Sequence, residues 1–128
     1  MDGRFIATFV IDGDGLLRVA DRRSEHVACA GGEPVRSAGE ITFELTGRSP
    51  RIDAITNQST GYCPEPQSWE AVAIALNVAN LDYRGLDGFE PALEFRRCVS
   101  CSIINIAKNN VFRCSVCDAH LPASWNFS

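Results

Sequence analysis

Four cysteines near the end of this chain have the spacing of a metal site. They form two Cys-x-x-Cys pairs separated by twelve residues: Cys98, Cys101, Cys114 and Cys117. Structural zinc sites hold Zn²⁺ in a tetrahedron of four thiolates, and a turn with two intervening residues lets both sulfurs of a pair converge on one ion. Because protein thiolates would fill all four positions, the ion would be structural rather than catalytic.

The segment between the two pairs is suited to a hairpin. Residues 103–113 place β-branched and aromatic residues around Asn109-Asn110, where asparagine tolerates positive φ. With this hairpin, residues 94–121 resemble a zinc ribbon of the rubredoxin-like, four-cysteine kind, and the resemblance implies that the four cysteines are zinc ligands. The commonest ribbon pattern has glycine just after each Cys-x-x-Cys turn, or knuckle, whereas Ser102 and Asp118 stand there in this chain.

Other uses of these cysteines are an iron site of the rubredoxin type, which has the same spacing, a disulfide framework, and a redox Cys-x-x-Cys. His120 could also replace one cysteine in a mixed site. Residues 1–4 lack the basic-then-apolar order of a signal peptide, and the longest uncharged runs have eleven residues, against about 20 for a membrane span. We therefore expect zinc, a reducing cytoplasm and no membrane segment.

A cysteine-dependent enzyme is the main alternative function. Cys63 lies in a polar loop, residues 57–66, just before a predicted helix, where a thiol has a lowered pKa. Asn57 could donate a hydrogen bond to an oxyanion, and His26 could act as the base. Such a polar composition is also typical of ordinary turns, so a structural loop is the favoured interpretation.

The first two thirds of the chain are predicted to build a small antiparallel sheet or open barrel. Residues 5–11 and 16–20 flank an Asp-Gly-Asp-Gly turn signal and predict a hairpin, while residues 41–46 alternate between apolar and polar and predict a strand paired with 51–56. Residues 26–30 are a fifth strand candidate, in which Cys29 is expected to be buried.

One amphipathic helix is predicted over about residues 67–80. Trp69, Val72, Ala73 and Leu76 form one apolar stripe, and Ser68 is expected to cap the helix N-terminus. Residues 81–91 are expected to be a connector. The predicted class is therefore α+β, with a domain over residues 1–92 and a zinc-ribbon module over 93–128. We expect Trp125 and Phe127 in the module's tail to pack back on the sheet or to dock on a partner.

Charge is unevenly distributed along the 128 residues. The formal net charge is −4, of which residues 1–92 carry −6 and residues 93–128 carry +2. A nucleic-acid-binding ribbon would use Arg96, Arg97, Lys108 and Arg113, with Phe95 or Phe112 as a stacking ring. Because the acidic body opposes wide contact with phosphates, we expect instead a small zinc-binding, non-enzymatic protein-interaction or adaptor protein. A basic protein surface is then a more plausible partner than nucleic acid.

Overall fold

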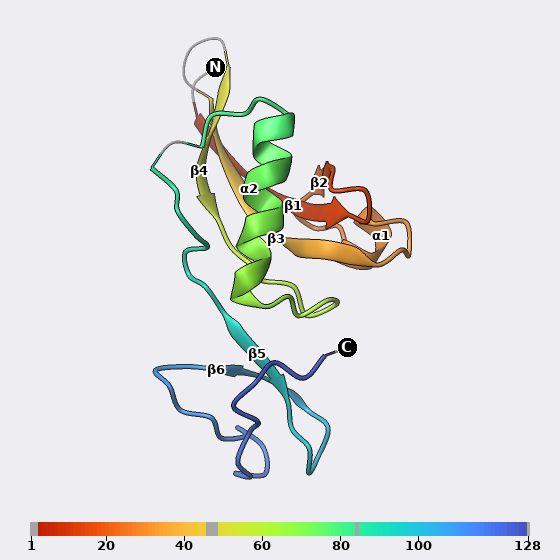
Figure 1. The fold of residues 1–128 in the computed structure, drawn as a ribbon, viewed down its shortest axis with the longest axis vertical. Helices are drawn as coiled ribbons and strands as arrows, with labels where there is room; N and C mark the ends of the chain where they lie inside the picture. The colour runs from red at the N-terminus through yellow and green to blue at the C-terminus, as the bar shows by residue number, and fades with distance from the viewer. Residues whose placement is uncertain (1–2, 46–48, 84, 128) are drawn as a thin grey trace.

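The computed structural model describes residues 3–45, 49–83 and 85–127. Its N-terminal half is a four-stranded antiparallel sheet, and a smaller cysteine-bearing unit lies beneath it (Figure 1). The four strands, in the order β2-β1-β3-β4 across the sheet, are β1 (Gly3–Asp12), β2 (Leu17–Asp21), β3 (Val35–Leu45) and β4 (Pro50–Ile55). The sheet is open, so the antiparallel sheet predicted from the sequence is confirmed and the barrel is not.

The N-terminal hairpin is confirmed by the pairing of β1 with β2, in which Phe9 lies opposite Val19. At the turn, the Asp12 carboxylate accepts hydrogen bonds from the backbone N–H groups of Leu16 and Asp14 and from the Arg18 guanidinium. These donors, Leu16 first, hold the pKa of Asp12 below its ordinary value. The carboxylate is therefore fully engaged in fixing the turn.

The predicted strand at residues 26–30 is wrong, because these residues form a short helix, α1 (His26–Cys29). The two glycines that follow end this helix: Gly31 and Gly32 have φ of 64° and 80°, and their N–H groups bond to Ala28 O and Val27 O. This pattern is a Schellman motif, so the Gly-Gly pair is a helix C-cap rather than a strand breaker.

The predicted strands 41–46 and 51–56 are paired as β3 and β4, with Ile41 opposite Ile55. β3 begins earlier than predicted, at Val35, and pairs with the whole of β1. Residues 46–48, which include Thr46 at the end of the first predicted strand, lie outside the described residues.

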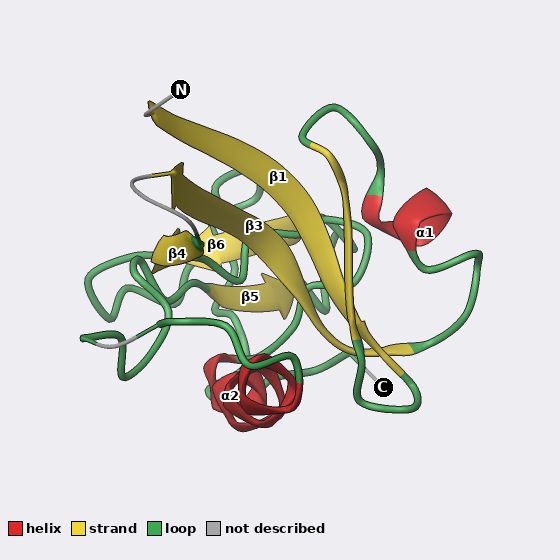
Figure 2. Cartoon of the chain, turned by 90° about the horizontal axis from the view of Figure 1, so that it is seen from above, coloured by secondary structure: helices red, strands yellow, loops and turns green. Residues whose placement is uncertain are grey.

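The predicted helix is confirmed as α2 (Trp69–Val78), which follows a 3-10 turn, η1 (Pro66–Ser68). It packs along one side of the sheet, seen end-on in Figure 2. Val72, Ala75 and Leu76 are its buried residues, so Ala75 takes the inner position predicted for Ala73. The predicted side-chain cap is wrong: Ser68 bonds through Oγ to Ser37 Oγ of β3 at 2.8 Å, which ties the start of the helix to the sheet.

The main core lies between α2 and the sheet. It combines alternate residues of the strands with the helix and with the connector that returns from it: Ala7, Phe9, Ile11, Ile41, Phe43, Ile52, Ile55, Val72, Ala75, Leu76 and Phe89. As predicted, the connector is not a second helix: its described residues, 81–83 and 85–91, contain no helix. Phe89 packs edge-on against Trp69 at 5.4 Å between ring centroids. No helix in the described part of the chain is long and apolar enough to cross a membrane.

A second, two-stranded sheet carries the cysteines. β5 (Glu94–Arg97) pairs antiparallel with β6 (Ile104–Ala107), and the first knuckle joins them. The tail, up to Phe127, then runs back toward the four-stranded sheet (Figure 1). We call residues 93–127 the cysteine module.

Candidate metal centre

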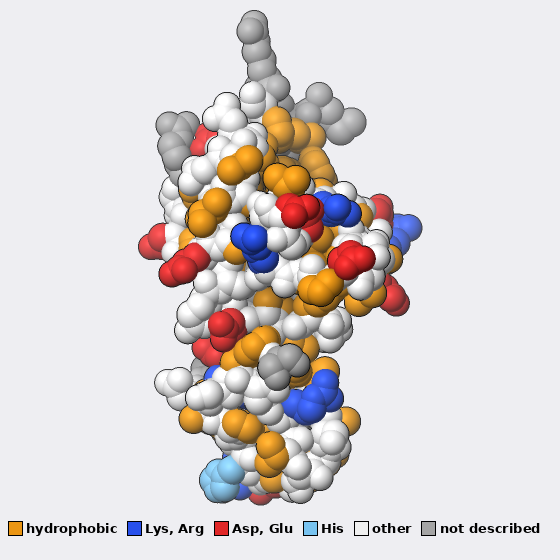
Figure 3. Space-filling model, turned by 45° about the vertical axis from the view of Figure 1, so that its right-hand side comes forward, with side chains coloured by type: hydrophobic (Ala, Val, Ile, Leu, Met, Phe, Trp, Pro, Cys, Tyr) orange, Lys and Arg blue, Asp and Glu red, His pale blue; other side chains and the backbone are white. Residues whose placement is uncertain are grey.

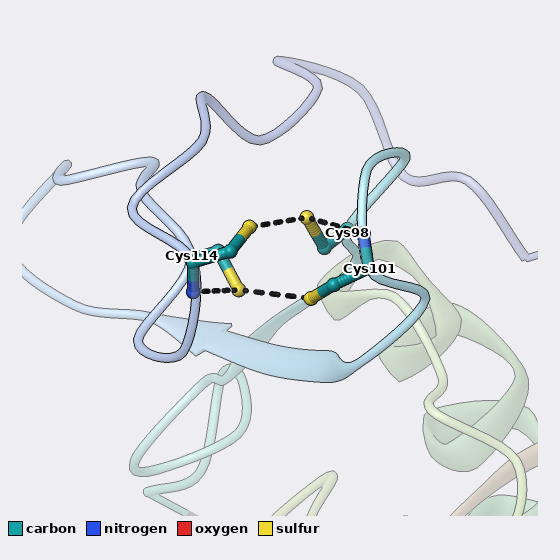
Figure 4. A group of neighbouring side chains, drawn as sticks. Cys98, Cys101 and Cys114 are labelled. Atoms are coloured by element: carbon teal, nitrogen blue, oxygen red, sulfur yellow. Dashed lines mark hydrogen bonds between the residues drawn. The ribbon is translucent and has the colours of Figure 1, made fainter.

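The four cysteines predicted to be metal ligands converge on one point. Their sulfur atoms all lie within 4.8 Å of one another, with Cys98 Sγ 3.6 Å from Cys117 Sγ and Cys101 Sγ 3.5 Å from Cys114 Sγ. Zn–S bonds of about 2.3 Å in a regular tetrahedron place sulfurs about 3.8 Å apart. Figure 4 shows Cys98 and Cys101 on one loop, facing Cys114 on the opposite loop. All six cysteines of the chain are free thiols in this structure.

The two knuckles have the same hydrogen-bond pattern. In the first, Cys98 N–H donates to Ile103 O and Ser102 N–H to Cys98 O; in the second, Cys114 N–H donates to Ala119 O and Asp118 N–H to Cys114 O. In each knuckle the second cysteine's N–H also points at the first cysteine's sulfur, at 3.5 Å. The backbone therefore aims N–H donors at sulfurs, as four thiolates around a cation require.

Ser102 and Asp118 occupy the positions where ribbons commonly have glycine. Both adopt positive φ, 68° and 64°, so the backbone conformation that favours glycine is present here without it. The preceding arginines stabilise these residues: Arg97 Nη1 donates to Ser102 O and Arg113 Nη1 donates to Asp118 O, each at 3.0 Å. The repeated Arg-Cys-x-x-Cys sequence therefore builds two matched, braced turns.

The segment between the knuckles turns at Asn109-Asn110, as predicted. The two asparagines have φ of 53° and 62°, and Val111 N–H bonds to Lys108 O. This tight turn reverses the chain after β6 and brings Cys114 back toward the first knuckle. β6, however, forms its ladder with β5, and not with the residues that follow Asn109-Asn110.

Asn105 is a site residue that the sequence reasoning missed. It lies on β6, is 5% exposed, and its Nδ2 lies 3.5 Å from Cys114 Sγ. Its Oδ1 accepts hydrogen bonds from the N–H and the hydroxyl of Ser115, at 2.8 and 3.1 Å. Asn105 therefore contacts both a metal ligand and the loop that carries this ligand. Such a buried side chain holds the ligand in place without binding the metal itself. The signal in the sequence was a polar residue alternating with Ile104 and Ile106.

The environment divides the thiols by acidity. Backbone N–H groups of Cys117 and Val116 lower the pKa of Cys114 to about 6, and the N–H of Cys101 lowers the pKa of Cys98. For Cys101, a backbone hydrogen bond with Ile103 acts in the same direction, but desolvation and the neighbouring thiols raise its pKa to about 12. Cys101 therefore retains a proton that a bound cation would displace.

The donor set fits a soft divalent metal that takes four thiolates, since the chain supplies all four and holds them near tetrahedral spacing. His120 is not in this group; it is exposed and pairs through its backbone with Arg113. A mixed site with His120 therefore has no support from the described residues.

Asn57 has a structural environment. It is fully buried and its amide donates to Pro64 O at 3.0 Å and to Leu93 O at 2.9 Å, while its Oδ1 accepts from Leu93 N–H at 2.7 Å. Both N–H donors that an oxyanion would need are therefore occupied. The side chain joins the 57–66 loop to the strand leading into the cysteine module.

Cys63 and His26 also have separate hydrogen-bond partners. Cys63 is 2% exposed, its thiol lies 3.5 Å from Thr60 O, and burial raises its pKa despite the nearby Arg97. The His26 ring bonds through Nε2 to Gly39 O at 2.8 Å. Among the described residues no hydrogen bond joins the two side chains. Cys29 is half-buried beside Val10 and Ala30, and burial likewise raises its pKa.

Three of the four module cations are engaged inside the module. Arg96 is 4% exposed, bonds to Pro122 O and Ala123 O, and lies over the Phe112 ring at 5.3 Å. Arg97 and Arg113 brace the knuckles, and Phe95 is fully buried. On the face drawn in Figure 3, blue, red and orange side chains are interspersed rather than gathered by charge.

The aromatic tail packs back on the molecule, where Trp125 bonds to the 57–66 loop and lines a hollow together with Val35 and Ser37 of β3. Trp125 Nε1 donates to Cys63 O at 2.7 Å, and Phe127 lies under the Arg97 guanidinium at 5.5 Å. Asn126 exchanges two hydrogen bonds with the backbone of Arg97, so the tail covers the outer edge of β5. Comparisons with protein-family models, curated proteins and solved structures found no match to this chain.

Proposed function

We propose that the cysteine module is a zinc ribbon that binds one structural Zn²⁺, and that the protein is a non-enzymatic protein-interaction or adaptor protein in a reducing cytoplasm. The observation that carries the proposal is the convergence of four sulfurs within 4.8 Å on two knuckles of identical hydrogen-bond pattern. A site closed by four protein thiolates leaves no position for a reactive water.

The module's small core supports a folding role for the metal. Besides Phe95, its buried apolar side chains form one cluster of Cys98, Cys114 and Leu121, with Cys101, Phe112 and Ala119 packed against it. So few apolar side chains cannot offset the conformational entropy of ordering about 35 residues, at about 1–2 kcal/mol for each backbone. Bound zinc can supply about 10–16 kcal/mol of apparent free energy to such a segment.

Exposed apolar side chains at the knuckles support an interaction role. Val99 and Val116 lie inside the two Cys-x-x-Cys turns and are 75% and 68% exposed. Burying such apolar side chains under a partner lowers the free energy of the complex. The net charge of −6 over residues 1–92 favours a partner with a basic surface.

Metal analysis of the purified chain tests the zinc site. We expect one zinc and no iron per chain, loss of that zinc in Cys114→Ser, and full retention in the matched control Cys29→Ser. Iron at this stoichiometry, or unchanged zinc in Cys114→Ser, would refute the assignment.

The interaction role needs a separate test. We expect the wild-type chain, crosslinked in a lysate of its source cells, to capture a protein that the zinc-loaded double variant Val99→Glu/Val116→Glu does not capture. Ile74→Glu, on the exposed side of α2 (62% exposed), is the control that should still capture it. Identical capture by all three proteins would contradict a role for the knuckles.

A further inference from the structure

The four-stranded sheet has an unfilled strand position at one edge. β1 pairs with β3 from Gly3 onward, but its pairing with β2 begins only at Ala7, opposite Asp21. Beyond Asp21 the chain turns away, and Arg22 O and Ser24 O lie near the Thr8 hydroxyl instead. We call the stretch of β1 next to this gap, residues 3–6, the open edge.

Backbone groups of the open edge point into the gap. In an antiparallel strand, residues bonded to one neighbour alternate with residues bonded to the other. Asp12 N–H bonds to Leu16 O on the β2 side, so the even-numbered residues of β1 face β2. Arg4 and Ile6 therefore direct their N–H and C=O groups toward the gap, where the described residues provide no strand to pair with them.

A surface hollow of about 1090 Å³ adjoins this edge. Its apolar lining includes Phe5, Ile6 and Val19, which are 45%, 36% and 44% exposed. Its charged lining includes three arginines and two aspartates. Arg4 is paired with Asp53 at 3.4 Å, whereas Arg22 and Arg23 are exposed at the end of β2. The local charge is therefore positive on a chain that is acidic overall.

We propose that an extended segment of a partner protein, with apolar residues alternating along it and at least one carboxylate, adds to the sheet along the open edge of β1. Backbone hydrogen bonds to Arg4 and Ile6 would give affinity, and the carboxylate would face Arg22 and Arg23. The alternate apolar side chains would cover Phe5 and Val19, which lie on the same face of the sheet as Phe9. A second copy of the chain is a poorer occupant, because symmetric pairing would bring like-charged arginines together. This inference rests on the proposed interaction role and adds a second contact surface, where the local charge is positive although the chain as a whole is acidic.

A library of ten-residue linear peptides displayed on phage is the probe, with the zinc-loaded full chain as target. We expect enriched peptides to alternate apolar residues and to carry Asp or Glu. A synthetic copy of an enriched peptide should slow hydrogen exchange of the Arg4 and Ile6 amides in nuclear magnetic resonance spectra. In the free protein these two amides should exchange faster than that of Thr8, which faces Ala20 of β2.

Substitutions at the edge make the test specific. Arg22→Glu and Arg23→Glu should each weaken the peptide roughly fivefold, which corresponds to about 1 kcal/mol, whereas the distant Lys108→Glu should leave affinity unchanged. Ile6→Pro removes an N–H group that bonds to no strand, so it should abolish peptide binding and leave the fold intact. Val10 faces Arg18 inside the β1–β2 ladder, so Val10→Pro should destabilise the protein.

Three results would overturn this inference: no enrichment of peptides, equal binding by all variants, or a dimer that forms through the same amides. None of them affects the zinc stoichiometry, and capture through Val99 and Val116 would survive them. Failure of the open edge is therefore distinguishable from failure of the proposed function.

Discussion

Asn57→Ala tests whether Asn57 is a structural connection or a catalytic group. The side chain is fully buried and makes three hydrogen bonds, to Pro64 O, Leu93 O and Leu93 N–H, at 3.0, 2.9 and 2.7 Å. Alanine would leave all three backbone groups without this partner. An unsatisfied buried group costs about 1–3 kcal/mol, so we expect a loss of roughly 3–5 kcal/mol in the free energy of unfolding.

The loss can be measured by urea denaturation of the zinc-loaded chain, followed by tryptophan fluorescence and circular dichroism. It would be a large share of the about 5–15 kcal/mol that stabilises a typical domain. Gln58→Ala is the matched control: the neighbouring side chain is exposed, so we expect a change within about 0.5 kcal/mol. Asn57→Asp keeps the acceptor for Leu93 N–H but loses both donors, and should be destabilising as well.

A loss below about 1 kcal/mol for Asn57→Ala, with an unchanged denaturant slope, would refute the assignment of these hydrogen bonds as structural. An oxyanion donor behaves in the opposite way, because its removal lowers turnover by roughly 10²–10³-fold and leaves stability intact.

Three further predictions concern the cysteines and their surroundings. Ser102→Gly and Asp118→Gly should each raise the free energy of unfolding of the zinc-loaded protein by roughly 0.5–1 kcal/mol, since both residues have positive φ. The control Ser100→Gly should not raise it. Equal effects at all three sites in urea denaturation would contradict this prediction. Asn105→Leu should weaken zinc roughly 10–100-fold in competition titrations with a chromogenic chelator, and unchanged affinity would show that its contact with Cys114 Sγ does not position the site. Cys63 should resist iodoacetamide at pH 7 in the native protein, as followed by mass spectrometry, because burial raises the pKa of its thiol. The contribution of this thiol to stability is complete below its unfolded pKa of about 9 and falls as pH rises through the pKa of the folded state. Rapid labelling at pH 7 would instead indicate an activated thiol.

Local signals determined much of this protein. The Asp-Gly-Asp-Gly turn predicted the first hairpin, the alternation at Ile41 and Phe43 predicted β3, and the apolar stripe predicted α2. The cysteine spacing predicted which four sulfurs would meet. The hairpin, strand and helix signals, and each Cys-x-x-Cys pair taken singly, lie within a few residues along the chain, where hydrogen bonding and side-chain periodicity act directly.

Long-range packing decided the rest. Residues 26–29 form a helix because Gly31 and Gly32 close a helical C-terminus and the His26 ring bonds across to β3. Ser68 bonds to Ser37 from a distant strand instead of capping its own helix. The Gly31-Gly32 cap is visible in the local sequence, whereas Gly39 and Ser37, the partners of His26 and Ser68 on β3, are not.

Tertiary structure also decided which polar residues are structural. Arg96 was a candidate for a nucleic-acid patch, but the returning tail buries it and accepts its hydrogen bonds. Asn57 was a candidate oxyanion donor, but Leu93, thirty-six residues away, occupies it. The sequence gives the same residue type whether a polar side chain is exposed to solvent or belongs to a buried hydrogen-bond network. The hydrogen-bond partner that folding brings to the side chain determines whether its role is structural or functional.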